Sequence, residues 1–295
     1  MAPLTIERLR LLLAVSAHGT IAGAAEDVGY TPSAVSQQLS ALERELGTTL
    51  LERSNRGVSL TPAGARLSER ASVILDLTQM ATIEATQAGP RAAPIALRIG
   101  AFPTAISSIV VPAIALLAPM VAVTIVDVEP EQAFADLAAR HLDAAIVDYY
   151  ESALTPSRAG LHHVTLVTDP LRIAIRSDRL PPQAPRDLVD MPWILGGTHS
   201  RLGHATRAAL RAVGVEPHVV VESDDHWMAF DVMDKLNVAT VLPDLALKAA
   251  PAHVNRLVHI DLGFDRHIRL VTRDVLRPHP GFALLEQVFR TLMAA

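Results

Sequence analysis

The stretch YTPSAVSQQLSALERELGTTLLERSNRGVSLTPAG, residues 30–64, decides the fold of the N-terminal part of the chain. Thr31 is a typical helix N-cap, and Pro32 suits the first helical turn because a missing N–H costs nothing there. Gly47 follows the last apolar position of the pattern and ends the helix. The sequence therefore predicts a capped helix between Thr31 and Gly47.

This helix has two different faces. At ~100° per residue, one narrow arc that must face a core contains Val35, Leu39, Leu42 and Leu46. The opposite side carries short polar groups, one amide and one guanidinium, from Ser33, Ser36, Gln37, Ser40 and Arg44. Such a face can approach a phosphate backbone and reach base edges in a major groove. A plain solvated face is the alternative, and the flanking sequence decides between them.

Two shorter helical patterns precede this helix. Residues 4–18 repeat leucines on a 3.6-residue period, and Gly19 ends that pattern. Thr20 is typical of an N-cap for a second helix, IAGAAEDV, which Gly29 stops. Three short helices with tight turns between them indicate a helix-turn-helix.

The segment that follows the third helix is rich in arginine. From Arg53 to Arg66 there are three arginines and no acid, and Gly57 marks a turn before the strand-like GVSL. An arginine-bearing β-turn beside a helix-turn-helix is typical of a wing that contacts phosphates or a minor groove. Residues 1–90 nevertheless hold seven Arg, no Lys and nine acids. We therefore expect modest non-specific affinity, with contacts concentrated at the helix and the wing.

The bulk composition excludes several classes of protein. A chain of 295 residues predicts more than one domain. It contains no uncharged apolar run of 18 residues, so no membrane span is expected. The start, MAPLTIERLR, is not a secretory signal. The chain has no cysteine, which excludes disulfides, thiolate metal sites and a cysteine nucleophile. A reducing, cytoplasmic setting fits this composition.

The rest of the chain changes in character twice. A long helical pattern runs from Thr61 to about Ala88, and GPRAAP then breaks it as a hinge. From Ile95 onward, β-branched apolar runs alternate with helical stretches, which indicates βα units and a mostly parallel sheet. We find no internal repeat and no low-complexity tract.

The N-terminal segment resembles the DNA-binding domain of LysR-type transcriptional regulators. The residues that match the family pattern in register are Ala24, Ala25, Ala34, Val35, Ser36, Gln38, Leu42, Glu43, Leu46, Gly47, Leu50, Arg53, Arg56, Leu60, Thr61, Ala63 and Gly64. Pro32 stands where the family often has a base-reading glutamine, Ser33 where it often has proline, and Leu51 where it usually has phenylalanine. The DNA-binding residues predicted on this basis are Thr31, Pro32, Ser33, Ser36, Gln37, Ser40, Arg53 and Arg56.

The resemblance covers essentially the whole chain, and it implies the domain organisation. We expect an α/β protein with an N-terminal all-α winged helix-turn-helix, a long linker helix and a two-lobed effector domain similar to type II periplasmic binding proteins. The expected ranges are 1–60 for the winged helix-turn-helix, 61–89 for the linker and dimerisation helix, and 90–295 for the effector domain. Within it, lobe 1 is about 95–162 and 268–295, and lobe 2 is about 163–267.

Two strand-to-helix junctions are candidates for the effector site, since ligands of open α/β sheets bind at strand ends beside helix N-termini. GAFPTAISS places Phe102, Pro103 and Thr104 on one wall, and ILGGTHSRLG places Gly197, Thr198 and His199 opposite. A hydroxyl beside each helix start suits a carboxylate or another oxygen-rich ligand. Ordinary helix capping is the alternative for each threonine, and the family resemblance favours ligand contact.

Other polar residues leave alternatives open. Tyr149, with Asp148 and Tyr150, follows a predicted strand and either reaches the hinge and the effector or forms a surface loop. Asp224, Asp225 and His226 precede a helix and are expected to cap it, and Trp193 and Trp227 are expected in the core. The histidines show no helical metal-binding spacing, so no metal and no cofactor other than a small-molecule effector is expected.

The function expected from this sequence is ligand-responsive transcriptional regulation. No G-x-S-x-G, G-x-G-x-x-G, P-loop or H-E-x-x-H motif points to an enzyme. A DNA-binding architectural protein whose α/β part only oligomerises is a third possibility, and a ligand-dependent shift in melting temperature separates it from a sensor. The expected partners are double-stranded DNA, a small-molecule metabolite and further copies of the chain in a homodimer or homotetramer, in the cytoplasm and with no membrane.

Overall fold

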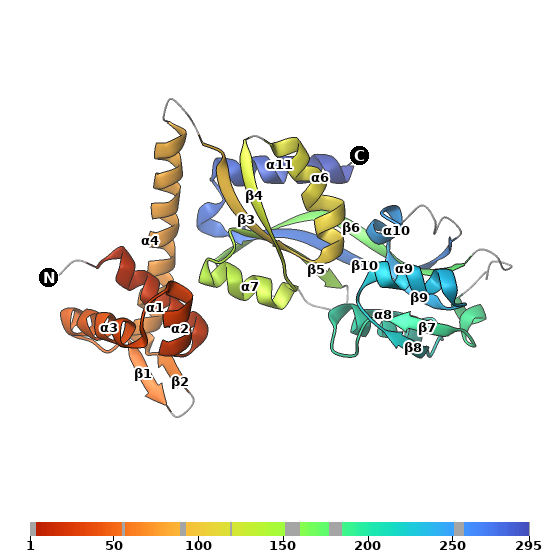
Figure 1. Ribbon diagram of the computed structural model, residues 1–295, viewed down its shortest axis with the longest axis horizontal. Coiled ribbons are helices and arrows are strands. Elements are labelled where there is room, and N and C mark those ends of the chain that lie inside the picture. Colours follow the sequence, from red (N-terminus) through yellow and green to blue (C-terminus); the bar gives the residue numbers. More distant parts are fainter. Residues whose placement is uncertain are drawn as a thin grey trace.

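The computed structural model describes residues 4–54, 57–88, 93–118, 120–150, 160–176, 185–250 and 257–294. The N-terminal domain, the linker helix and two α/β lobes follow one another along the longest axis of the molecule (Figure 1). The α/β fold with an N-terminal winged helix-turn-helix is confirmed.

The N-terminal domain contains three helices and a hairpin. The elements are α1 (Ile6–His18), α2 (Ile21–Val28), α3 (Pro32–Leu46), β1 (Leu51–Ser54) and β2 (Gly57–Leu60). Each helix begins at a threonine whose hydroxyl accepts a backbone N–H, from Arg8, Gly23 and Ala34 respectively. Each ends at a glycine with positive φ, which is the usual left-handed C-cap. Local capping chemistry thus fixes all three helices.

The wing is held against the helices by backbone contacts that need glycine. Val58 N donates to Gly19 O at 2.8 Å, and Gly57 has a φ of 131°. A Cβ on Gly57 would lie 2.5 Å from Gly19 O, so no larger side chain fits at this turn. The carboxylate of Glu43 on α3 also accepts the N–H groups of Leu50, at 2.7 Å, and Leu51, at 3.0 Å. The hairpin is therefore fixed relative to α3.

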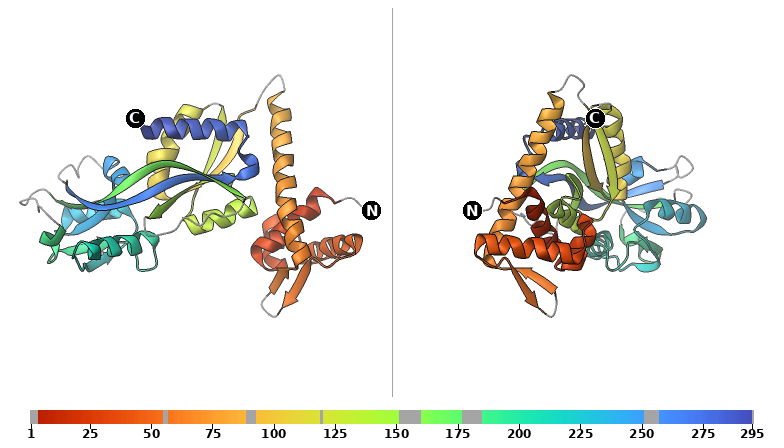
Figure 2. Two further views of the ribbon diagram at one scale, coloured as in Figure 1. Left: turned by 180° about the vertical axis from the view of Figure 1, so that it is seen from behind. Right: turned by 60° about the vertical axis from the view of Figure 1, so that its left-hand side comes forward.

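The linker helix α4 (Pro62–Gln87) rises from the N-terminal domain and lies beside the first lobe (Figures 1 and 2). Its N-cap Thr61 accepts from Gly64 N at 3.0 Å and donates to Thr49 O at 2.8 Å. Asp76 on α4 is buried between two arginines of the first lobe, Arg140 and Arg273. The linker helix is thus joined to both domains by specific contacts.

The two lobes share one eight-stranded sheet. Its order is β4-β3-β5-β10-β6-β9-β7-β8. The strands are β3 (Ile95–Ala101), β4 (Val121–Asp127), β5 (Ala144–Tyr150), β6 (Leu161–Arg176), β7 (Pro192–Leu195), β8 (His218–Glu222), β9 (Ala239–Pro243) and β10 (Leu257–Arg273). Strands β6 and β10 pair antiparallel and run through both lobes, so they form the two connections between them (Figure 2).

Helices cover both faces of each half of the sheet. In the first lobe, α5 (Pro103–Ala105), η1 (Ile106–Val110), α6 (Val111–Leu117) and α11 (Pro280–Ala294) lie on one face and α7 (Pro130–Ala139) on the other (Figure 1). The second lobe has α8 (Arg201–Ala212), α9 (His226–Lys235), α10 (Asp244–Lys248) and the short turn η2 (Pro185–Leu188). The turn η4 (Asp274–Leu276) links β10 to α11. Apolar side chains on both faces of the sheet explain the near-continuous apolar strand sequences.

Candidate functional site

The first candidate site is the outer face of α3. Val35, Leu39 and Leu42 are buried, as the periodicity predicts, but Leu46 is 36% exposed, so its predicted place in the core is wrong. Leu46 is the last residue of the helix, where the chain turns away at Gly47.

The predicted DNA-binding residues of α3 lie at the surface. Thr31, Pro32, Ser33, Gln37 and Ser40 are exposed, whereas Ser36 is half-buried. The hydroxyls of Thr31 and Ser33 lie 3.1 Å apart at the start of the helix. Arg53 is placed by its backbone in β1 opposite Val58, and Arg56 lies outside the described residues. The face thus presents short hydroxyl groups and an amide at the N-terminal end of a helix, which is a geometry that fits a major groove.

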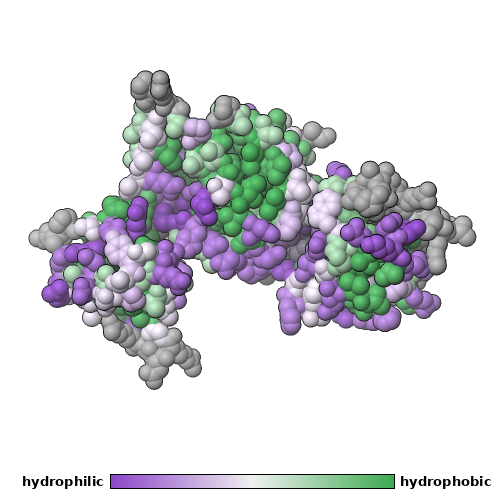
Figure 3. Space-filling model, in the orientation of Figure 1, coloured by the Kyte–Doolittle hydropathy of each residue, from purple (hydrophilic) through white to green (hydrophobic). Residues whose placement is uncertain are grey.

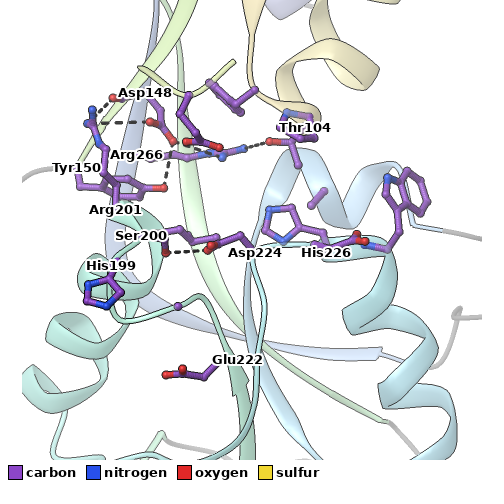
Figure 4. Close-up of a pocket in the computed structure, with 18 of the residues that line it drawn as sticks. Thr104, Asp148, Tyr150, His199, Ser200, Arg201, Glu222, Asp224, His226 and Arg266 are labelled. Atoms are coloured by element: carbon purple, nitrogen blue, oxygen red, sulfur yellow. Dashed lines mark hydrogen bonds and ion pairs between the residues drawn. The ribbon is translucent and has the colours of Figure 1, made fainter. Parts of the chain in front are cut away.

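The second candidate site is a cavity of about 1120 Å³ between the two lobes. Figure 4 shows the side chains that converge on it from both sides. Its walls come from the carboxyl ends of β3, β5, β7 and β8 and from the helix starts that follow them. The structure brings together six of the seven predicted effector residues on these walls, namely Phe102, Pro103, Thr104, Gly197, Thr198 and His199.

Tyr149 is the seventh, and it is not among the lining residues. Alternate residues of a strand face opposite sides, so Tyr150 lines the cavity while Tyr149 faces the other side of the sheet. There the Tyr149 ring lies 5.0 Å from the guanidinium carbon of Arg269. Both tyrosines and Asp148 are buried within β5, so the expectation of a surface loop is also wrong.

Arg266 is the most buried charge at the cavity, with 2% of its surface exposed. Its Nε lies 2.8 Å from Asp169, and one terminal nitrogen donates to the hydroxyl of Thr104 at 3.1 Å. The other terminal nitrogen lies 3.8 Å from Asp148, and the guanidinium carbon is 5.1 Å from the centre of the Phe102 ring. Thr104 therefore holds the arginine in place, and its hydroxyl is already engaged.

A second arginine joins the lobes across the cavity. Arg201, at the start of α8 in the second lobe, contacts Glu131 of α7 at 3.0 Å. It also donates to the carbonyl oxygen of Asp148 in β5 at 2.6 Å. This arginine is only partly exposed, and it holds the second lobe against the first.

The segment 224–227 matches its prediction only in part. Asp225 caps α9 as expected, since its Oδ1 accepts from Trp227 N at 2.8 Å and Met228 N at 3.2 Å. Asp224 instead accepts from the Ser200 hydroxyl at 2.8 Å. Trp227 is 48% exposed and lines the cavity, so its predicted place in the core is wrong, whereas Trp193 is fully buried.

Burial shifts the pKa values of several cavity side chains, among them His226 and Tyr150. Burial, with the nearby charge of Arg266 as a further cause, lowers the pKa of His226 to about 4, so this imidazole is neutral near pH 7. Burial raises the pKa of Tyr150, whose hydroxyl donates to Asp148 at 3.1 Å. The cavity therefore contains a neutral imidazole beside several carboxyl groups.

The sequence reasoning missed the residues that dominate this site. Arg266, Asp169, Arg201 and Glu129 were not singled out, although the structure brings them to the cavity or its arginines. The signal available was a charged residue inside an apolar strand, as Asp169 stands in VTLVTDPLRIAI. Within the described ranges, no group of three or more acidic or histidine side chains is arranged to hold a metal ion.

Comparison with known proteins gives the same two parts. Residues 6–65 match the bacterial regulatory helix-turn-helix protein, lysR family, and residues 95–294 match the LysR substrate binding domain. No helix among the described residues is long and apolar enough to cross a membrane.

The similar curated proteins are regulators. The chain is 43% identical over 97 residues to the HTH-type transcriptional regulator YofA of Bacillus velezensis, a match that covers 33% of each protein. It is 32% identical over 202 residues to a probable hydrogen peroxide-inducible genes activator of Mycobacterium avium, covering 65% of this chain and 62% of that protein. The match to OxyR of Escherichia coli is 28% identical and covers 83% of this chain and 80% of OxyR.

Solved structures share the fold along the full length. A variant of full-length OxyR from Pseudomonas aeruginosa aligns with a TM-score of 0.69 at 21% identity, covering 98% of this chain and 96% of that one. Full-length CbnR in complex with its target DNA aligns with a TM-score of 0.55 at 20% identity. The chain is therefore a DNA-binding transcriptional regulator rather than an enzyme, and it belongs to the lysR family.

Proposed function

We propose that this regulator binds duplex DNA through α3 and the β1–β2 hairpin, and that a small-molecule effector in the cavity between the lobes changes that binding. The observation that carries the proposal is the cavity of about 1120 Å³, which both lobes line in a chain that also exposes the polar face of α3. A cavity of this size is ample for a small metabolite.

The contacts of α4 support a route from the cavity to the DNA-binding domain. Asp76 is 1% exposed and lies 2.9 Å from Arg273 Nε, and it also pairs with Arg140. From the other side, Asp27 of α2 contacts His141 at 2.7 Å. A rearrangement of the first lobe would therefore move both the linker helix and the N-terminal domain.

Exposed apolar side chains support assembly into a homodimer or homotetramer. Ile74 and Leu77 on α4 are 36% and 54% exposed. The small N-terminal domain therefore leaves both apolar side chains accessible to a partner. On the first lobe, the face near α6 and β4 is largely hydrophobic (Figure 3), with Val111, Leu116 and Met120 at 50% or more exposure. Contiguous exposed apolar surface of this kind is typical of protein interfaces. We propose pairing through α4 and a second contact through the effector lobes.

The names of some relatives refer to hydrogen peroxide, but we do not propose a response to peroxide for this chain. A thiol-based response to peroxide needs a cysteine that can be oxidised. This chain has none, so its effector must act by binding. We propose no cofactor beyond that effector, and a cytoplasmic location where the chain meets DNA.

The proposal is tested on the full-length chain with a metabolite library. Effectors that bind the folded protein raise its melting temperature, by an amount that grows with ligand concentration over Kd. Compounds that pass this screen are then added to gel shifts with an operator selected from random duplexes. If no compound changes either the melting temperature or the operator complex, the α/β part serves assembly only and the proposal is wrong.

A further inference from the structure

The charge of the cavity is strongly unbalanced. The described residues that line it include six carboxylates and two guanidinium groups, and none of them is a lysine. The carboxylates belong to Glu129, Glu131, Asp148, Glu222, Asp224 and Asp225. The guanidinium groups belong to Arg201 and Arg266, so the cavity has a large excess of negative charge.

Both arginines are already paired with carboxylates of the protein. Arg266 lies 2.8 Å from Asp169 and 3.8 Å from Asp148, and Arg201 lies 3.0 Å from Glu131. A ligand carboxylate would have to displace one of these groups from its partner. The cavity therefore offers no unpaired guanidinium from its described residues to an anion.

The helix starts that could attract an anion also face protein carboxylates. At α8, the Ser200 hydroxyl accepts from Gly203 N at 2.8 Å and donates to Asp224 at 2.8 Å. At α9, Asp225 itself accepts the first free N–H groups. Because the positive ends of both helices are satisfied in this way, they leave little attraction for a ligand carboxylate.

Of the three cavity carboxylates on the first lobe, one is unpaired among the described residues. The Glu129 side chain, at the start of α7, makes no hydrogen bond or ion pair with any residue that the structure describes. Partial burial raises its pKa, and the charges of Asp148 and Asp224 raise it further. Asp224 belongs to the second lobe and Asp148 to the first, so like charges face each other across the cleft. Their repulsion opposes closure of the empty cavity.

We propose that the effector is an organic cation, a primary amine or a guanidinium with an apolar body, whose charge lies between Glu129 of the first lobe and Asp224 of the second. This inference rests on the proposed function, since it names the ligand class of the same cavity. A cation there replaces repulsion between the lobes by two attractions, and so it favours the closed arrangement.

The remaining lining residues fit the other parts of such a ligand. The neutral imidazole of His226 has no partner among the described residues, and it can accept an N–H from the ligand. Trp227, Phe230 and Phe102 provide apolar surface for the body. A bare metal ion fits less well, because the described acidic and histidine side chains do not converge as a metal site requires.

The experiment compares matched probes on the full-length chain. One series is 2-phenylethylamine, 2-phenylethanol and 3-phenylpropanoate, and a second is butylamine, butan-1-ol and pentanoate. Each series keeps one apolar body and changes the polar group at its end from a cation to a neutral hydroxyl or an anion. We expect the amines to raise the melting temperature and to bind about tenfold or more tightly than their alcohols, with no shift from the carboxylates.

Two variants test where the charge of the ligand lies. Glu129→Gln and Asp224→Asn should each weaken amine binding about tenfold, because each removes one charged partner of the ammonium group. Glu216→Gln is the matched control, since Glu216 is on the second lobe, pairs with Arg211 and does not line the cavity. Equal amine affinity in the parent and in both cavity variants would overturn the placement.

The outcomes separate this inference from the proposed function. Preferential binding of a carboxylate would overturn the cationic ligand but leave an effector-responsive regulator. If no probe, charged or neutral, changes the melting temperature or the operator gel shift, the proposal of a cationic ligand is wrong. Silence from the whole metabolite library as well would overturn the proposed function.

Discussion

Arg266 and Arg273 lie on the same strand, β10, and serve two different sites. Arg266 Nε is 2.8 Å from Asp169 beside the cavity, whereas Arg273 Nε is 2.9 Å from Asp76 on the linker helix. Both arginines are almost inaccessible to solvent. A displacement of β10 that accompanies ligand binding would therefore act on α4 through a buried ion pair.

We expect Asp76→Asn to separate ligand binding from the DNA response. The asparagine removes the carboxylate closest to Arg273 and leaves only Asp143, at 3.8 Å, and breaking a buried pair costs about 3–5 kcal/mol of stability. The melting temperature should fall, and the operator complex should stop responding to the amine probe. Calorimetry should give a probe affinity close to that of the parent, since Asp76 is remote from the cavity.

Gln79→Ala is the matched control for this experiment. It removes the hydrogen bond of 3.0 Å to Asp143 from the same helix without exposing an unpaired charge, at a cost of about 1 kcal/mol. The ligand response should survive in this variant. A full response in Asp76→Asn, with circular dichroism confirming the fold, would show that the signal travels by another route.

The linker helix should also hold the dimer together. Leu77 is 54% exposed in the single chain, so Leu77→Asp would place a charge in the predicted seam between two copies of α4. We expect dissociation in sedimentation velocity experiments, because an unpaired charge in an apolar interface costs several kcal/mol. Gln287→Asp, on the exposed side of α11, adds the same charge elsewhere. An oligomer that is unchanged in Leu77→Asp would exclude this seam.

The wing arginines should supply affinity rather than sequence choice. Arg53→Ala and Arg56→Ala should each weaken binding to operator and random duplexes alike. Each should lower the slope of log K against log salt by about one, since a phosphate contact releases about one counterion. Fluorescence anisotropy across a salt series measures both effects. A changed sequence preference at constant slope would instead assign these arginines to base contacts.

Gln37 provides the contrasting case, because it is exposed on α3 and has an amide suited to a base edge. Gln37→Ala should reduce the preference for operator over random duplex, with a cost of about 1–3 kcal/mol at the contacted position. The salt slope should stay the same. Loss of affinity for both duplexes in equal measure would place Gln37 on the backbone.

Local sequence predicted the N-terminal domain because its elements are fixed by local chemistry. Thr31, Gly47 and Thr61 cap helices through hydrogen bonds to residues three or four positions away, so their patterns can be read from the sequence. The cavity depends on contacts between distant segments. Asp169 and Arg266 meet only because β6 and β10 pair antiparallel, and no local pattern indicates that register.

Thr104 illustrates both sides of this difference. The strand-to-helix junction GAFPT placed it correctly on the wall of the cavity. Its hydroxyl, however, accepts from Arg266, a residue from a strand near the other end of the chain. The expected carboxylate or other oxygen-rich ligand followed from a hydroxyl beside each helix start, whereas the charge of the whole cavity favours a cation. Trp227 was misplaced for a similar reason, since a helical pattern does not show which face a cleft will expose.

The last prediction concerns Glu129 and pH. Its pKa in the folded protein is raised above the ordinary value of 4.5, first by burial and then by Asp148 and other nearby carboxylates. The folded protein therefore keeps a proton at a pH where the unfolded chain has lost it. The resulting destabilisation is absent below the unfolded pKa and is complete above the folded one. Glu129→Gln should accordingly raise the melting temperature of the ligand-free protein at about pH 7 and leave it unchanged at about pH 4.

The same titration of Glu129 should also affect ligand binding. Only the ionised carboxylate attracts an ammonium group, so amine affinity should fall as the pH drops through the raised pKa of Glu129, and this dependence should flatten in Glu129→Gln. Differential scanning fluorimetry and calorimetry across this pH range check both effects. A lower melting temperature for the variant at neutral pH would mean that the charge of Glu129 stabilises the fold, and an unchanged pH dependence of amine binding would mean that the ligand does not meet this carboxylate.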